Sequence, residues 1–218
     1  MPTYRDDLPE RPARIAALPL NDKGYPVPYF VAWIDGAPDF RIADPEKMRH
    51  CVREKRCWIC GQVLGKFQAF AIGPMCVVNR VSSEPPSHRD CVRYAARACP
   101  FLMHPRAQRR EANFPDEAHP MPGITVTRNP GVIALWNSSL PYSMFRAPGG
   151  FLFRVPEPDA IEWYAEGRTA TPAEVRESFD SGVVILREVA HAQGVDAEQQ
   201  IDREVARALH YLPESVSA

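Results

Sequence analysis

Apolar residues recur at helical spacing in two segments near the C-terminus. The first lies between Thr171 and Gly194, and Thr171, Pro172 and Glu174 match a helix start with a capping box. Its apolar face comprises Val175, Phe179, Val183, Leu186, Val189 and Ala190. The second helix is predicted to be capped by Asp196 and to bury the stripe Ile201, Val205, Ala208, Leu209 and Leu212 before Pro213.

Shorter apolar runs, rich in β-branched and aromatic residues, predict strands. An early run, Tyr29–Ile34, ends at the turn Asp35-Gly36, and Phe40–Ile42 is expected to pair with it. The later runs are Ile124–Thr127, Val132–Trp136, Tyr142–Phe145, Phe151–Val155 and Ile161–Tyr164. Strands and helices that follow each other in blocks predict the α+β class, with a small antiparallel sheet and two C-terminal helices.

Four potential metal ligands occur as two pairs with the same internal spacing. Cys57 and Cys60 are three residues apart, as are His88 and Cys91. This is the ligand spacing of structural zinc sites, and three thiolates with one imidazole complete a tetrahedron without an open position. We therefore predict one structural Zn²⁺ bound by these four residues.

The segment around the four ligands resembles treble-clef zinc modules. Its predicted order is a knuckle at Cys57–Gly61, a hairpin that joins Val63-Leu64 to Phe67–Ile72, and a helix over 88–98. Ser87 is the predicted N-cap of that helix. The resemblance is one of architecture over residues 57–100, and it implies a zinc-stabilised module. No family is recognised along the full chain.

Cys76 and Cys99 leave the ligand set open. A site of Cys57, Cys60, Cys76 and Cys91 is the four-cysteine alternative, with His88 at the surface. His88 is preferred because residues three apart in the first turn of a helix share one face. Cys51, Cys76 and Cys99 are then expected to be apolar core residues.

Charge is divided unevenly along the chain. Residues 47–110 carry 13 Lys and Arg against 3 Asp and Glu, whereas residues 111–218 carry 8 against 16. The basic block predicts a nucleic acid or an acidic protein as partner. The alternative is that the basic segment docks on the acidic half of its own chain. The candidate contacts to nucleic acid are Lys55, Arg56, Lys66, Arg80, Arg89 and Arg93.

Aromatic residues beside this basic block are candidate stacking platforms for bases. They are Trp58, Phe67 and Phe70, which could equally form the core of the zinc module. Phe67 and Phe70 are three apart on a predicted strand and so face opposite sides. At most one of the two is therefore expected to be exposed.

The chain is expected to contain three regions. Residues 1–45 form a proline-rich arm with a short hairpin, residues 46–112 the basic zinc-binding module, and residues 113–218 the sheet and helices, which could also form one compact unit with the rest. A helix is predicted over 46–56, with Asp44 as its N-cap. The first residues have no apolar core typical of a signal peptide, so a cytoplasmic, reducing environment is expected for the cysteines.

Two functions are compatible with these features. The favoured one is a non-catalytic intracellular zinc protein that acts as a binding or scaffold module, and no catalytic residue is assigned. The alternative is a metal-dependent nuclease of the His-Asn-His kind on a treble-clef scaffold. Asn79, His88, Asp90 and His104 supply suitable atoms for it, but no histidine follows the first strand as general base.

Overall fold

A four-stranded antiparallel sheet forms the centre of the molecule. In this computed structural model, which describes residues 2–104, 122 and 129–214, the strand order is β3-β5-β8-β9. The strands are β3 (Gln68–Ile72), β5 (Ile133–Ser138), β8 (Ala160–Ala165) and β9 (Arg168–Thr169). The predicted zinc module and the C-terminal region share this sheet, because β3 belongs to the first and β5 and β8 to the second.

Both faces of the sheet are covered, and alternate residues of each strand therefore belong to two separate cores. Phe70 and Trp136 point into one core together with residues of the C-terminal helices. Ala69, Leu135 and Tyr164 point into the other, which contains the cysteines of the predicted metal site. All six residues of β5 are buried, as expected of a strand between two layers.

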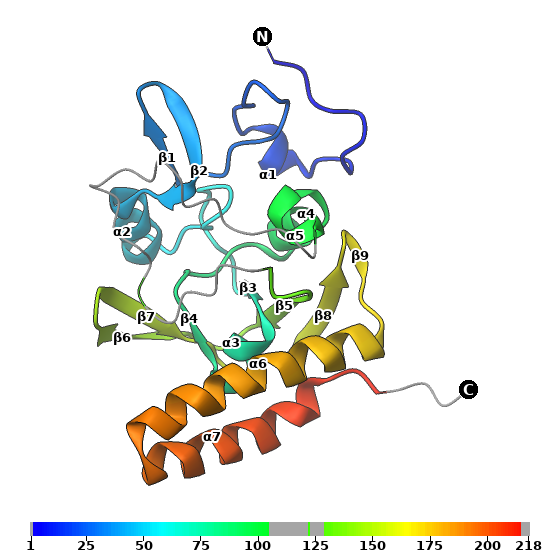
Figure 1. Cartoon of the computed structure of the whole chain (residues 1–218). Coiled ribbons are helices and arrows are strands. Elements are labelled where there is room, and N and C mark those ends of the chain that lie inside the picture. Colours follow the sequence, from blue (N-terminus) through cyan, green and yellow to red (C-terminus); the bar gives the residue numbers. More distant parts are fainter. Residues whose placement is uncertain (1, 105–121, 123–128, 215–218) are drawn as a thin grey trace.

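Two long antiparallel helices cover the first face (Figure 1). They are α6 (Pro172–Gln193), which begins with the predicted capping box of Thr171 and Glu174, and α7 (Val195–Ala208), which is followed by the 3-10 helix η1 (Leu209–Tyr211). The prediction of Asp196 as N-cap of α7 is wrong. Gly194 occupies that position at φ +103°, and Asp196 lies in the first turn. The tight turn at Gly194 starts α7 two residues earlier than predicted.

A second sheet lies beside the first and has the strand order β4-β7-β6. Its strands are β4 (Val81–Ser82), β6 (Ser143–Ala147) and β7 (Gly150–Arg154). The short helix α3 (Pro74–Asn79) connects β3 to β4 and packs against α6 and α7. Gly182 of α6 permits this packing, because a Cβ atom there would lie 3.0 Å from Met75 Cγ.

The opposite face of the central sheet is covered by a helix that begins at the predicted metal ligands. The helix α4 (Arg89–Ala98) packs on β3, β5 and β8, and α5 (Pro100–Met103) follows it. The N-terminal segment with α1 (Ala13–Ala16) lies over α4 (Figure 1). The helix α2 (Pro45–Arg53) is capped by Asp44 as predicted, although it ends three residues before the predicted end.

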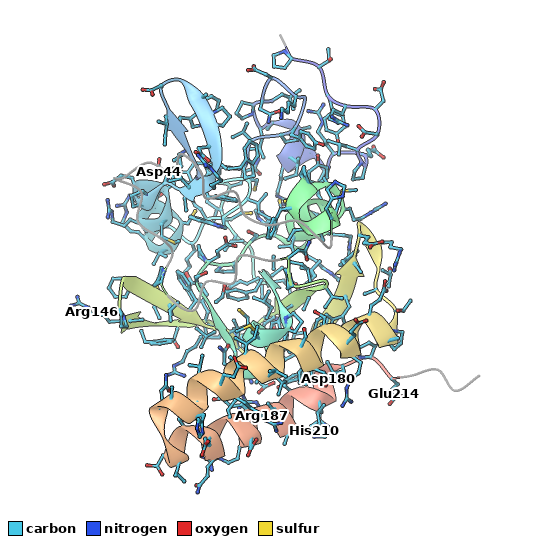
Figure 2. All side chains as sticks on the ribbon, viewed as in Figure 1. Asp44, Arg146, Asp180, Arg187, His210 and Glu214 are labelled. Atoms are coloured by element: carbon cyan, nitrogen blue, oxygen red, sulfur yellow. The ribbon has the colours of Figure 1, made fainter. Side chains whose placement is uncertain are left out.

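The early hairpin forms at the predicted place. It consists of β1 (Val31–Ile34) and β2 (Ala37–Ala43), and Asp35 and Gly36 both have positive φ in its turn. Figure 2 shows Asp44 where the hairpin leads into α2. The predicted strand Ile124–Thr127 lies outside the described residues. Predicted strands, capping box and helices together confirm the α+β class, with an antiparallel sheet and two C-terminal helices.

The predicted hairpin between Val63-Leu64 and Phe67–Ile72 is wrong. Val63 forms a bridge with Arg56 instead, and β3 pairs with β5 along its whole length. Ala69 also forms a bridge with Ser87, so the chain runs antiparallel to β3 just before α4 begins. The strand Gln68–Ile72 therefore has two partners that are distant in sequence. A local hairpin with Val63-Leu64 would have occupied one edge of this strand and left room for only one of them.

Candidate metal centre

The four predicted ligands lie together at one point on the face of the central sheet that α4 covers. The ligand atoms of Cys57, Cys60, His88 and Cys91 all lie within 4.8 Å of one another, and all four residues are buried. Among the described residues, this is the group of metal-ligand side chains that the structure brings together in this way. The cluster includes His88, and it contains neither Cys76 nor Cys99.

The first pair sits on a tight knuckle that the local sequence enforces. Arg56 bridges Val63, and the Cys57 amide donates to Gln62 O at 2.8 Å, which closes the loop. Gly61 donates to Cys57 O at 2.8 Å with φ +73°, a conformation that favours glycine. The ring of Tyr29 lies 2.7 Å from the position of a Cβ atom on Gly61, so a side chain there is also excluded by space.

Backbone amides of the knuckle and of the second pair point at one sulfur. The amides of Cys60 and His88 lie 3.4 Å and 3.3 Å from Cys57 Sγ. Such amide donors stabilise negative charge on the sulfur, as second-shell hydrogen bonds do in metal–thiolate sites. The peptide backbone thus prepares Cys57 to act as a thiolate.

The second pair is placed by the start of α4. His88 is the N-cap residue and Cys91 lies in the first turn, so their side chains meet on one side of the helix. The prediction of Ser87 as N-cap is wrong by one residue. Ser87 pairs with Ala69 through its backbone, and its hydroxyl accepts from the Ile59 amide at 3.3 Å, which ties the knuckle to the helix start.

The two ring nitrogens of His88 have different partners. Nδ1 lies 3.4 Å from Cys60 Sγ and 4.0 Å from Cys91 Sγ, whereas Nε2 lies 3.0 Å from Val63 O. A carbonyl oxygen only accepts, so Nε2 carries a proton, and Nδ1 faces the sulfurs. This contact with Val63 O, which the sequence did not indicate, is the usual support for a metal-bound imidazole.

Two of the ligand separations are close to those expected around a tetrahedral ion. Zinc–sulfur bonds of about 2.3 Å and zinc–nitrogen bonds of about 2.0 Å separate neighbouring tetrahedral ligands by about 3.5 to 3.8 Å. The observed nitrogen–sulfur separations of 3.4 Å and 4.0 Å bracket this range. Four buried ligands leave no coordination position for water or substrate. The cluster could therefore hold a metal ion whose role is structural.

Proton affinities within the cluster are strongly divided. Burial opposes ionisation of Cys57, but hydrogen bonds with Cys60, Cys91 and His88 outweigh it and lower the Cys57 pKa. Hydrogen bonds with Cys57 and Cys60 raise the pKa of His88 to about 10, and they also raise the pKa of Cys91. A bound cation would replace the protons that His88 and Cys91 hold in its absence.

Burial favours the neutral thiol form of the other described cysteines. Burial raises the pKa of Cys51 to about 12 and that of Cys76 to about 11, and it also raises the pKa of Cys99. Cys51 is buried in the core as predicted and its Sγ lies 3.8 Å from Cys57 O. Cys76 and Cys99 are only partly buried. Cys51 fits the predicted role of a core residue, and Cys76 packs against the first core from a partly buried position. The prediction is wrong for Cys99, which belongs to neither of the two core clusters of the described residues.

Four of the six candidate basic residues are paired with glutamates of the same chain. Arg89 and Arg93 both bind Glu162 of β8, Arg80 binds Glu157, and Arg56 binds Glu54. Three of these four contacts join the basic segment to the acidic C-terminal region. The intramolecular alternative for the charge pattern thus accounts for Arg80, Arg89 and Arg93.

The two remaining basic residues flank the knuckle. Lys55 and Lys66 are exposed, and Lys66 Nζ lies 5.8 Å from the centre of the Phe67 ring. Phe67 is 54% exposed, whereas Phe70 and Trp58 are buried. Trp58 stacks on Phe30 at 4.9 Å and belongs to the protein interior. Of the three aromatic candidates, only Phe67 is available for stacking on a base.

The four residues that could supply nuclease chemistry do not form one site in the structure. Asn79 Oδ1 accepts from the Val81 amide, and Asp90 forms an ion pair with Arg14. His104 follows α5, where its carbonyl accepts from Asn129. Only His88 belongs to the cluster, and its Nδ1 faces three sulfurs.

Comparison of the chain with protein-family models, with curated proteins and with solved structures finds no match. Within the described residues, no helix has the length and apolar character needed to cross a membrane.

Proposed function

We propose that the protein is a non-catalytic zinc-binding module that binds nucleic acid, in which Zn²⁺ holds the knuckle and the start of α4 together. The convergence of four buried Cys and His ligand atoms within 4.8 Å carries this proposal. Zinc suits a set of three thiolates and one imidazole in tetrahedral geometry, and a closed site has no position for catalysis.

Support for the metal comes from where the cluster sits. It links the knuckle at Cys57–Cys60 to α4, and α4 lies against three strands of the central sheet. A cation there neutralises thiolates that burial would otherwise disfavour. Zinc would thereby stabilise the layer on this face of the sheet. The knuckle, the antiparallel contact through Ala69 and Ser87, and the helix follow the order of treble-clef modules, with α3 and β4 inserted.

Support for nucleic acid comes from the surface of the knuckle. Lys55 and Lys66 lie on its two arms, which are joined by the hydrogen bond from the Leu64 amide to Lys55 O at 2.8 Å. Phe67 offers an exposed ring beside Lys66. Cations next to an exposed aromatic ring match the way single strands are bound, by phosphate attraction and base stacking. An acidic protein would use the lysines but would gain less from Phe67.

The first experiment measures metal. Protein purified without added chelator is expected to contain about one zinc per chain, and the same chain without metal is expected to lose stability. A preparation that folds normally with no zinc contradicts the structural part of the proposal.

The second experiment measures binding of a fluorescent single-stranded oligonucleotide at two salt concentrations. Lys55→Gln and Lys66→Gln are each expected to weaken binding and to lower the slope of log K against log salt by about 0.7. Phe67→Ala is expected to cost about 1 to 3 kcal/mol with little change in that slope. Lys23→Gln, an exposed lysine far away in the N-terminal segment, is the matched control. Binding of an acidic protein, without any oligonucleotide binding, would contradict the choice of partner.

A further inference from the structure

An open, polar surface cavity of about 280 Å³ lies away from the Cys/His cluster, where four chain segments meet, and Ser143, Arg154 and Arg207 are exposed at it. It is bounded by Asn79 and Arg80 at the end of α3, by Ser143 of β6, by Arg154 of β7, and by Glu204 and Arg207 of α7. Figure 1 shows β6 and β7 on the same side of the molecule, above α7. Three arginines that are distant in sequence therefore line one cavity.

Arg80 forms a fixed wall of this cavity. Its backbone adopts the left-handed conformation, with φ +55°, at the end of α3. Its Nε and Nη2 donate to Val155 O at 3.0 Å and 2.9 Å, and Nη1 binds Glu157. These bonds leave the Arg80 side chain only 16% exposed and hold it in place.

Arg154 and Arg207 differ from most of the described arginines. Many described arginines pair with a carboxylate, as Arg89 and Arg93 do. The side chain of Arg154 instead stacks on Phe145, with its Cζ 4.6 Å from the ring centre, and Arg207 Nη2 donates to Val78 O at 3.3 Å. Within the described part of the chain, neither has an ion pair, so most of their N–H donors remain available to a ligand.

Neutral donors complete the lining, and one carboxylate opposes them. Asn79 Oδ1 is used by the Val81 amide, which leaves its Nδ2 as a donor, and Ser143 contributes a hydroxyl. Glu204 also lines the cavity and accepts from Gln200 Nε2 at 3.0 Å. The charge of Arg207 also acts on the carboxylate of Glu157, but that carboxylate accepts hydrogen bonds from Arg80 and Tyr211. The cavity retains excess positive charge after both glutamates are counted.

We propose that this cavity binds the phosphate group of a small phosphate monoester, with Arg154 and Arg207 as its principal ligands. Planar guanidinium groups bind phosphate oxygens through two parallel N–H donors, and neutral hydroxyl and amide groups add directional hydrogen bonds. The cavity volume lies just below the usual range of small-molecule sites, which favours a compact ligand. The binding depends neither on zinc nor on the knuckle surface.

The test uses calorimetric titration of the full-length, zinc-containing chain with inorganic phosphate at constant ionic strength. Saturable binding with one site per chain is expected. Arg154→Gln and Arg207→Gln should each weaken it at least tenfold, while their unfolding temperatures stay close to that of the unsubstituted protein. Arg154→Lys, which keeps the charge but loses the paired donors, should give an intermediate affinity and guards against a misfolded glutamine variant.

Two other arginines serve as matched controls. Arg203 lies one turn before Arg207 on α7, and Arg146 projects outward from β6 (Figure 2). Arg203→Gln and Arg146→Gln should leave phosphate binding unchanged. Equal weakening by these controls would show that only the net charge matters, and it would overturn the site. Absence of saturable phosphate binding would overturn it as well.

Two further ligands distinguish a small phosphate monoester from the phosphodiester backbone of a nucleic acid. Glycerol 3-phosphate should compete with inorganic phosphate, and this competition should be lost in Arg207→Gln. A single-stranded oligonucleotide without terminal phosphates contains only diesters and should not compete. Competition by the oligonucleotide but not by glycerol 3-phosphate would overturn the assignment to a small monoester.

Discussion

Arg93 of α4 and Glu162 of β8 form a two-point ion pair. Arg93 Nη2 lies 2.6 Å from Glu162 Oε1, and Nε lies 3.0 Å from Oε2. Arg89 and the hydroxyl of Tyr164 bind the same carboxylate. The helix α4, which begins at the Cys/His cluster, is thereby held to the central sheet on its exposed side, while Val92 and Ala96 pack into the core on its other side.

The pH dependence of stability should reveal this ion pair. Hydrogen bonds from Arg93, then from Tyr164 and Arg89, outweigh burial and lower the pKa of Glu162 to about 2 from its ordinary value of 4.5. A carboxyl group with a lowered pKa stabilises the fold above its unfolded-state pKa, and this contribution disappears as the pH falls through the folded-state value. Glu162→Gln should therefore cost about 1 to 2 kcal/mol at pH 7.

The measurement is the free energy of unfolding by urea for the unsubstituted protein and for Glu162→Gln as a function of pH. The difference should shrink between about pH 4.5 and pH 2. Glu188→Gln, which removes a charge from an exposed position of α6, is the control and should show little difference. A constant difference across this range would argue against the ion pair. If the Cys/His cluster holds zinc as proposed, its release in acid affects all three proteins and cancels in the comparison.

Removal of the metal should loosen one face of the sheet before the other. Chelation is expected to expose the backbone amides of the knuckle and of the first turns of α4 to exchange with solvent. Without the metal, only hydrogen bonds between thiols and the imidazole join these two segments, and such bonds are weaker than metal–ligand bonds. The core of α6, α7 and Trp136 lies on the opposite face and should keep its protection. Hydrogen exchange with and without chelator measures both regions in one experiment. Simultaneous loss of protection in α6 would contradict this order.

The identity of the ligands can be checked by single substitutions. Cys57→Ser and His88→Ala should reduce bound zinc from about one per chain to near zero, and loss of several kcal/mol should lower the unfolding temperature by roughly 10 °C or more. Cys76→Ser and Cys99→Ser should retain zinc, because neither residue belongs to the cluster. Elemental analysis of the purified variants measures this. Loss of zinc in Cys76→Ser would instead favour the four-cysteine site.

A pair of glycines tests the knuckle itself. Gly61→Ala places a methyl group 2.7 Å from the Tyr29 ring at φ +73°, and the strain should cost at least about 2 kcal/mol. Gly65→Ala, four residues on, meets no atom within 4 Å and should be nearly neutral. Thermal unfolding with zinc present compares the two. If both substitutions were harmless, the tight packing of Tyr29 on the knuckle would be wrong.

Local sequence patterns were sufficient to predict the Cys/His cluster, several helix starts and one hairpin of this protein. Cys57, Cys60, His88 and Cys91 could be chosen from spacing alone, because a knuckle and a helix start each fix two ligands within a few residues. The starts of α2 and α6 could be predicted as well, because Asp44 and the pair Thr171 and Glu174 cap them through short-range hydrogen bonds. The same holds for the β1–β2 hairpin, since Asp35-Gly36 dictates its own turn.

Long-range partners were decided by the tertiary structure alone. A strand pattern does not name its neighbour, so β3 was assigned to a local hairpin although it pairs with β5, more than sixty residues later. Charge composition could not show that Arg89 and Arg93 face Glu162, nor that Arg154 and Arg207 meet around one cavity. These relationships depend on how distant segments fold onto one another, because burial and pairing are properties of the packed chain.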